Sequence, residues 1–168
     1  MNFLFRFSLA LFVVAAIAGC SGGRTQTNST SQTPSTKITA EQLRKLRWIE
    51  GSWRGTGVNQ APFFERYRFE SDTVLAVDGF ENEKLEKVTE TTRFELKDGE
   101  FGGGNEGARY VASILDDNSI TFEPRVKVRN LFIWKRESKD AWTAIIKWPA
   151  NADKPARERV YNMERWPK

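Results

Sequence analysis

Five side chains that can bind a charged group or transfer a proton lie in stretches rich in aromatic and β-branched residues: Glu65, Tyr67, Glu90, Arg159 and Tyr161. Successive side chains of a strand point to opposite faces, and the alternation places each of the five on the apolar face of its stretch. We therefore expect them inside the folded protein. An arginine and a tyrosine hydroxyl there suit the anionic head of a ligand, and the aromatic residues suit an apolar tail.

Two other interpretations fit the same residues. A buried glutamate beside an arginine forms an internal ion pair in many proteins, because unpaired buried charge costs several kcal/mol. Two interior carboxylates can also serve as acid and base in hydrolysis, if one has a raised pKa and the two lie at a set separation. Sequence gives no separation, and a neighbouring arginine makes such a pair a poor catalyst, so we favour a protein that is not an enzyme.

The elements that carry these residues are predicted to be strands. After Gly51 the chain alternates between turn signals such as Lys97-Asp98-Gly99 and stretches that favour strands. We expect strands at 63–70, 73–80, 85–96, 108–115, 120–123, 128–136, 142–148 and 157–166. Short connections make neighbouring strands antiparallel, so the sequence predicts an all-β, up-and-down antiparallel barrel of about eight to ten strands.

One short helix precedes the strands. Thr39 and Gln42 form a capping-box pattern, and Leu43 and Leu46 begin a run of apolar residues at helical spacing. We expect the helix to end near Glu50 and to plug one end of the barrel.

The helix leads into the run Trp48-Ile49-Glu50-Gly51-Ser52-Trp53-Arg54-Gly55-Thr56-Gly57. This run, with its Gly-x-Trp at Gly51 and Trp53, resembles the opening of calycin barrels, which include lipocalins, fatty-acid-binding proteins and the nitrobindin-like group. The resemblance implies that Trp53 closes the barrel floor and that a basic residue of the last strand, Arg165 or Arg159, lies across its ring. Arg159-Val160-Tyr161 also resembles the Arg-x-Tyr with which fatty-acid-binding proteins hold a ligand carboxylate.

The N-terminus predicts export. Arg6 precedes an almost purely apolar stretch that ends in Ile17-Ala18-Gly19-Cys20, which is typical of a cleaved signal and shorter than the roughly 20 residues of a membrane-spanning helix. The run resembles the lipobox of bacterial lipoproteins. The resemblance implies that residues 1–19 are removed and that Cys20 carries acyl chains, palmitate among them. With Ser21 next, it implies an outer-membrane anchor facing the periplasm in a Gram-negative envelope.

The remaining chain divides at residue 37. Residues 21–37 contain no aliphatic side chain to bury, so we expect residues 20–37 to form a disordered, lipid-anchored linker with a reach of about 20 to 25 Å. Residues 38–168 then form one barrel domain, which is a common domain size.

Composition excludes several chemistries. The sequence has no histidine and one cysteine, which excludes Ser-His-Asp and Cys-His triads, histidine-ligated zinc or haem, and disulfides within the chain. We therefore expect no cofactor and no metal. The formal net charge of +4 is mild and favours contact with anionic lipid over nucleic acid.

Two further patterns receive structural interpretations. Residues 102–107 match a dinucleotide-binding Gly-x-Gly-x-x-Gly, but the next residues favour a strand where that motif needs a helix, so we predict a hairpin loop. Residues 125–129 alternate basic and apolar side chains, which we interpret as a solvated strand face and not as a membrane-docking site.

The sequence thus favours an envelope lipoprotein whose barrel binds a small amphipathic or apolar molecule. The alternative is a scaffold or protein-interaction module whose barrel is filled by its 12 Phe, 6 Trp and 3 Tyr, since small barrels are often packed solid with side chains. An enzyme that uses the interior carboxylates is the second alternative.

Overall fold

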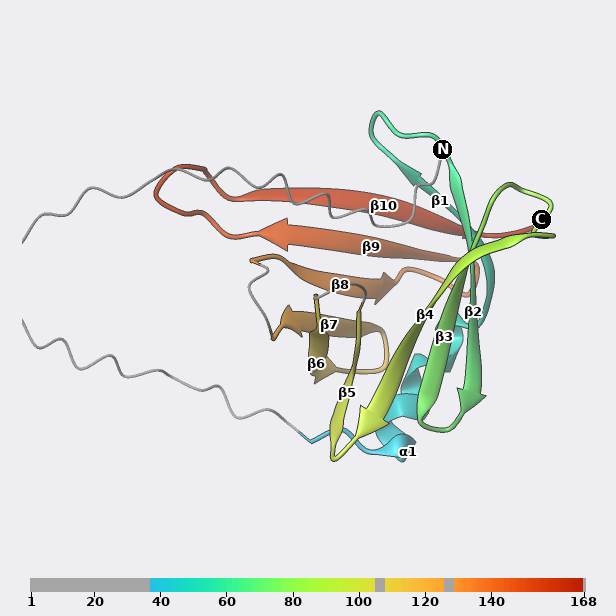
Figure 1. The fold of residues 1–168 in the computed structure, drawn as a ribbon, viewed down its shortest axis with the longest axis horizontal. Coiled ribbons are helices and arrows are strands. Elements are labelled where there is room, and N and C mark those ends of the chain that lie inside the picture. The colour runs from blue at the N-terminus through green and yellow to red at the C-terminus, as the bar shows by residue number, and fades with distance from the viewer. Residues whose placement is uncertain (1–36, 105–107, 126–128, 168) are drawn as a thin grey trace, which may run out of the picture.

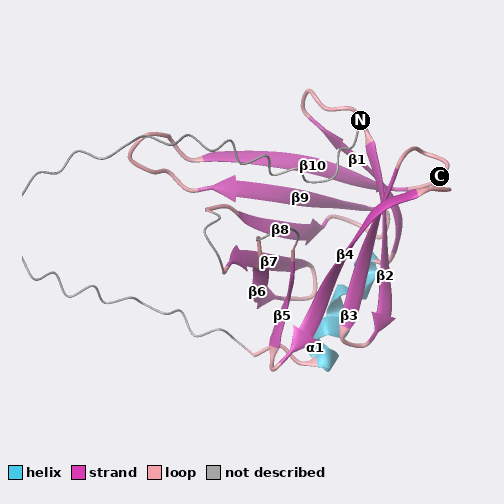
Figure 2. Ribbon diagram, in the orientation of Figure 1, coloured by secondary structure: helices cyan, strands magenta, loops and turns pink. Residues whose placement is uncertain are grey.

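The computed structural model describes residues 37–104, 108–125 and 129–167, so Cys20 and the predicted signal and linker lie outside the described residues. Within the described ranges, ten antiparallel strands pair in sequence order, and the last pairs with the first to close a barrel (Figure 1 and Figure 2). The predicted all-β class and the up-and-down antiparallel barrel are confirmed.

The strands coincide with the aromatic and β-branched stretches of the sequence, because such side chains pack well on a half-buried pleated surface. Their bounds are β1 (Gly51–Gly57), β2 (Phe63–Ser71), β3 (Val74–Phe80), β4 (Val88–Lys97), β5 (Glu100–Gly103), β6 (Tyr110–Leu115), β7 (Ser119–Pro124), β8 (Leu131–Arg136), β9 (Ala141–Trp148) and β10 (Arg157–Arg165).

Strand β5 corrects the prediction of a hairpin loop over residues 102–107. Gly102 and Gly103 belong to this strand, while residues 105–107 lie outside the described part of the chain. A Cβ at Gly103 would overlap the carbonyl oxygen of Arg93 on β4, and one at Gly102 would overlap that of Tyr110 on β6. The glycines therefore permit close approach of the neighbouring backbones, while their low strand propensity hides the strand from sequence analysis.

The helix covers one end of the barrel, as predicted, and below we call this the closed end (Figure 1). It consists of α1 (Ala40–Leu43) and a 3₁₀ continuation, η1 (Arg44–Ile49). The predicted capping box is present: Thr39 Oγ1 accepts from the Gln42 backbone N–H, and Gln42 Oε1 accepts from the Thr39 backbone N–H. Neither described helix is long and apolar enough to cross a membrane. Three apolar side chains anchor the helix in the barrel and are fully buried: Leu43, Leu46 and Ile49.

Aromatic rings fill the barrel from the closed end upward. The Trp53 and Trp142 ring centroids lie 6.0 Å apart, and Tyr67 packs edge-on against Trp142 at 5.4 Å and Trp134 at 5.5 Å. Trp134 continues to Phe122 at 4.9 Å. Each such pair adds about 0.5–1.5 kcal/mol beyond the area it buries, so the core is held by contiguous ring contacts.

One predicted inward position is wrong. Val88 has the same parity as Glu90, so strict alternation along this stretch predicts that both face inward, but Val88 is 48% exposed. The pairing of β3 with β4 shifts between Gly79 and Phe80, so that Gly79 pairs with Glu90 and Phe80 with Val88. This irregularity breaks the two-residue alternation on which the prediction depended.

Candidate functional site

Glu65 and Tyr67 project from β2 into the barrel. Each residue is only 4% exposed. The Tyr67 hydroxyl donates a hydrogen bond of 2.7 Å to Oε2 of Glu65, which is possible because residues two apart on a strand share a face. Their neighbours Arg66 and Arg68 point outward, so β2 presents a carboxylate and a phenol to the interior and guanidinium groups to the exterior.

Strand β4 brings a second carboxylate to the same region. Gly79 of β3 pairs with Glu65 on one side and with Glu90 on the other, so the two glutamates lie two strand spacings apart, about 9–10 Å between backbones. The residue between them has no side chain. Glu90 is partly buried, and its charge acts on Glu65.

Both titratable groups of β2 in this site have raised pKa values. The pKa of Glu65 is raised to about 7, chiefly by burial; the hydrogen bond from Tyr67 opposes this rise and the charge of Glu90 adds to it. Burial and the adjacent carboxylate raise the pKa of Tyr67 well above its ordinary value. Tyr67 is therefore a neutral donor, and among the described residues Glu65 forms no ion pair with an arginine, which was one of the alternative interpretations of the interior glutamates.

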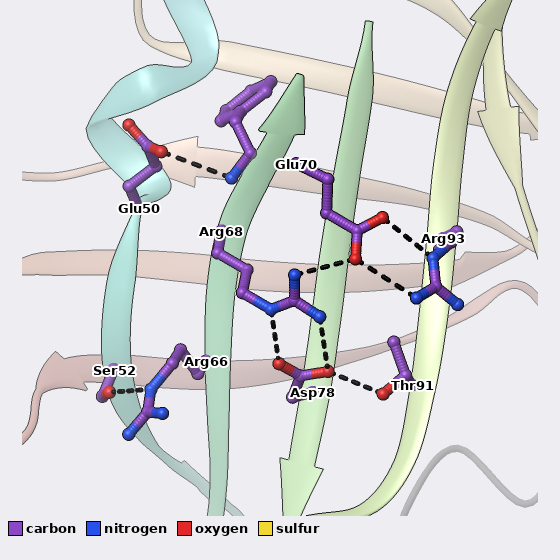
Figure 3. A network of polar contacts seen from close by, with 9 residues as sticks. Glu50, Ser52, Arg66, Arg68, Glu70, Asp78, Thr91 and Arg93 are labelled. Atoms are coloured by element: carbon purple, nitrogen blue, oxygen red, sulfur yellow. Dashed lines mark hydrogen bonds and ion pairs between the residues drawn. The ribbon is translucent and has the colours of Figure 1, made fainter. Parts of the chain in front are cut away.

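The outer face of the same strands shows the opposite arrangement (Figure 3). Asp78 on β3 is 6% exposed, but its carboxylate accepts from Arg68 Nε at 2.8 Å and from Thr91 Oγ1 at 2.6 Å. Burial raises the pKa of Asp78, yet these hydrogen bonds outweigh it and leave the pKa below its ordinary value. Glu70 continues the network between Arg68 and Arg93.

Arg159 and Tyr161 lie at the other end of the barrel, which we call the rim. Tyr161 is 7% exposed and packs edge-on against Phe63 at 5.5 Å, while Arg159 is exposed and donates from Nη1 to the Tyr161 hydroxyl at 3.3 Å. β10 extends beyond β1 here (Figure 1), since β1 pairs with β10 only as far as Tyr161. The structure brings Arg159 and Tyr161 together but does not bring Arg159 to Glu65.

The barrel floor joins the helix, β1 and β10. Arg165 pairs with Trp53 across the strands and places its guanidinium carbon 3.9 Å from the Trp53 ring centroid. It also donates to the carbonyl oxygens of Glu50 and Lys139, and burial lowers its pKa. Gly51 has φ +119°, and a Cβ there would overlap the Arg165 guanidinium. Arg165, and not Arg159, lies across Trp53.

Sequence analysis missed a buried tyrosine–asparagine pair near the rim. Tyr110, 4% exposed, donates from its hydroxyl to Oδ1 of Asn130 at 3.1 Å, and Asn130 is 1% exposed. Nδ2 of Asn130 has no hydrogen-bond partner among the described residues. No signal marks this asparagine, because it lies within a stretch predicted to be an ordinary strand.

The ranges that the structure describes contain no group of three side chains suited to hold a metal ion. Cys20 lies outside them, as do Val126, Lys127 and Val128 of the basic segment. At the two ends of that segment, Arg125 forms an ion pair of 3.2 Å with Glu100, and Arg129 is exposed.

No family model matches the chain, and no curated protein matches it significantly. Among solved structures it is similar to a DUF3598-family protein of unknown function from Nostoc punctiforme, at 14% identity and TM-score 0.47, covering 71% of this chain and 48% of that one. This chain thus spans about half the length of that protein.

Two further solved structures match the chain at lower similarity. One is EF1p2_mFAP2b bound to DFHBI, at 8% identity and TM-score 0.37, covering 74% of this chain and 98% of that one. The other is a redesigned β-barrel, at 9% identity and TM-score 0.33, covering 73% and 95%. The strand pairing of the described residues defines the class as a closed ten-stranded antiparallel barrel, and a proposal for its function has to rest on the chain's own residues.

Proposed function

We propose that this chain is an exported, lipid-anchored envelope protein whose barrel binds a small amphipathic or apolar molecule. The observation that carries the proposal is the position of Glu65, a carboxylate 4% exposed that faces the barrel interior. A buried ionisable group costs stability unless it is paired. Acids with strongly perturbed pKa values cluster at functional sites, which makes Glu65 a candidate for such a site.

The barrel interior contains both tightly packed apolar side chains and polar groups. Trp53, Trp142 and the helix fill the closed end, Glu65 lies beside Trp53 on the neighbouring strand, and Tyr161 lies toward the rim. A ligand that enters at the rim would meet Arg159 and Tyr161 first, then apolar rings, then the carboxylates. This order fits an amphipathic molecule, with apolar surface between two polar ends.

The scaffold alternative also has a specific observation in its favour. The ring contacts are continuous from Trp53 to the rim side of the barrel: Phe122 stacks on Phe132 at 4.5 Å, and Phe132 meets Tyr110 at 4.9 Å. A barrel filled in this way would use its outer face for partners. We prefer ligand binding, because ring packing does not account for Glu65.

Native mass spectrometry of the full-length chain, purified from a bacterial host and followed by organic extraction, tests the proposal. We expect a discrete bound mass in the parent that is lost in Ala144→Phe. Ala144 faces the interior, 6% exposed, between Trp134 and Tyr161, so a phenyl group there occupies ligand space.

Ile145→Phe on the opposite face of the same strand is the matched control and should keep the bound mass. An apo mass for the parent would favour the side-chain-filled scaffold. Turnover of an ester or glycoside panel that is lost in Glu65→Gln would favour the enzyme alternative.

A further inference from the structure

Glu65 differs from the buried acid of the outer face in what surrounds it. Asp78, similarly buried, receives two charge-assisted contacts from Arg68. Glu65 has no ion pair among the described residues, and its electrostatic neighbours are Tyr67 and a second acid, Glu90. Arg66 and Arg68 follow Glu65 closely in the sequence, but both point outward to Ser52 and Asp78, so among the described residues no cation pairs with the interior acid.

One oxygen of this carboxylate is available. Tyr67 donates to Oε2 at 2.7 Å, whereas Oε1 receives no hydrogen bond within the described ranges. An ionised carboxylate accepts at about four lone-pair positions. The Glu65 side chain is more than nine-tenths buried, and its Oε1 has no hydrogen-bond donor within the described ranges. A donor group on a ligand would satisfy this oxygen.

The aromatic rings packed around Tyr67, which hydrogen-bonds the carboxylate, fit the same chemistry. Tyr67 packs edge-on against Trp134 and Trp142, with interplanar angles of 88° and 87°. Aromatic faces attract cations, and clusters of them recognise alkylammonium groups. Glu90 adds negative charge to the same side of the barrel, so a carboxylate head would be repelled there and a cation attracted.

We infer that the ligand of this barrel carries a protonated amine on an apolar body, with the amine against Oε1 of Glu65. The inference rests on the proposed function and names its ligand class. Arg159 and Tyr161 alone suggest a ligand with an anionic head. Because these two residues lie at the rim, they would contact the outer end of the ligand, and the end beside Glu65 would be cationic.

Binding should depend on pH in a definite direction. The titratable groups facing Glu65 are Tyr67 on its own strand and Glu90 on β4, while β1 and β3 place the uncharged Trp53 and Gly79 beside it. Since burial raises the pKa of Glu65 to about 7, its ionised fraction grows as the pH rises through that value. An amine should therefore bind more tightly above neutral pH, and an anion should not.

Isothermal titration of the full-length chain with three matched indoles tests the inference: tryptamine, tryptophol and indole-3-acetate, which differ in head charge on one apolar body. Tryptamine should bind at least about tenfold more tightly than indole-3-acetate, and Glu65→Gln should weaken tryptamine roughly thirtyfold or more. The affinity for tryptophol, which has no charged head, should change by less than about threefold in Glu65→Gln. Glu95→Gln, an exposed glutamate on β4, is the matched control and should behave as the parent.

Equal binding of tryptamine and indole-3-acetate, or unchanged tryptamine binding in Glu65→Gln, would overturn the amine inference and leave the proposed function standing. If none of the three binds, the inference also fails, and the Ala144→Phe comparison decides the proposed function separately. Circular dichroism checks that Glu65→Gln folds. Glu90→Gln provides a second variant, and it should weaken tryptamine severalfold by removing one negative charge.

Discussion

Two buried acids on neighbouring strands illustrate how local partners decide protonation. Asp78 and Glu65 have nearly the same exposure, 6% and 4%, yet the pKa of Asp78 is lowered and that of Glu65 is raised to about 7. Burial acts in the same direction on both. The difference lies in Arg68 and Thr91, which donate to Asp78, whereas Glu65 has a neutral phenol and a like charge.

The first prediction concerns the pH dependence of stability. In the unfolded chain Glu65 loses its proton near 4.5, and in the folded chain near 7. Between these values the folded state holds a proton that the unfolded state has lost, so the free energy of unfolding falls as the pH rises through the window, by at most about 3 kcal/mol. Glu65→Gln should flatten this dependence and should be more stable than the parent above pH 7.

Denaturant titrations across the window measure this effect. The carboxylates with lowered pKa values, such as Asp72 and Asp78, lose their stabilising effect on the more acidic side, so they do not obscure it. A parent whose stability does not fall between the two pKa values, or a Glu65→Gln variant less stable than the parent at alkaline pH, would contradict the raised pKa.

The second prediction is that neutralising Asp78 destabilises the protein, whereas neutralising Glu65 stabilises it. Asp78→Asn removes the charge that Arg68 meets on the outer face and replaces an acceptor of the Thr91 hydroxyl with an amide. We expect a loss of about 1–3 kcal/mol at neutral pH, measured by urea unfolding. Stabilisation by Asp78→Asn, as expected for Glu65→Gln, would show that burial alone governs both acids.

At the scale of elements, Arg165 fastens β10 to the junction of the helix and β1. It lies over the Trp53 ring and donates to two carbonyl oxygens, so it satisfies backbone acceptors that the helix and the β8–β9 turn leave open. The 3₁₀ segment and β1 meet at Gly51, whose positive φ admits the guanidinium.

The third prediction compares the two arginines of the last strand. Arg165→Ala should cost about 2–3 kcal/mol, through the lost ring contact and the two unpaired carbonyl groups. Arg159→Ala should cost less than about 0.5 kcal/mol, because Arg159 is exposed at the rim. Thermal or urea unfolding of both variants measures the difference, and equal losses would mean that Arg165 does not hold the floor.

Sequence analysis predicts the strands and the interior position of Glu65 and Tyr67, because alternation holds along the regular strand β2. It fails where regularity fails: the register shift beside Gly79 turns Val88 outward, and the glycines of β5 hide a strand. The choice between Arg159 and Arg165 needs the pairing of Trp53 with Arg165, which is a long-range register. That no cation among the described residues pairs with Glu65 likewise depends on which way the neighbouring arginines point.

At the scale of the whole molecule, the polar groups are ordered along the barrel axis. The helix occupies the closed end, where Ile38 near the start of the described range donates to the carbonyl oxygen of Gly99, while Arg159 and Tyr161 lie at the opposite rim. If Cys20 carries the anchor, the rim points away from the attachment point of the linker. A ligand would then be exchanged with the surrounding compartment or a partner.

The fourth prediction concerns that anchor. Cys20→Ser should abolish acylation, because the thiol that accepts the diacylglyceryl group is gone, and should move the protein from the membrane to the soluble fraction. Metabolic labelling with a palmitate analogue and fractionation of the bacterial host measure both effects. Ser21→Ala, one residue further on, is the control and should stay labelled. Unlabelled parent protein in the soluble fraction would contradict the lipoprotein proposal.

The central claim is that the interior beside Glu65 receives a small molecule, and a crystal structure of the barrel purified without stripping tests it most directly. We predict density for a bound molecule between the carboxylate of Glu65 and the rim, with a donor atom within hydrogen-bond distance of Oε1. An interior closed by Tyr67, Trp134 and their neighbours, with Oε1 bonded to protein and no such density, would contradict the claim and favour a barrel packed by its own side chains.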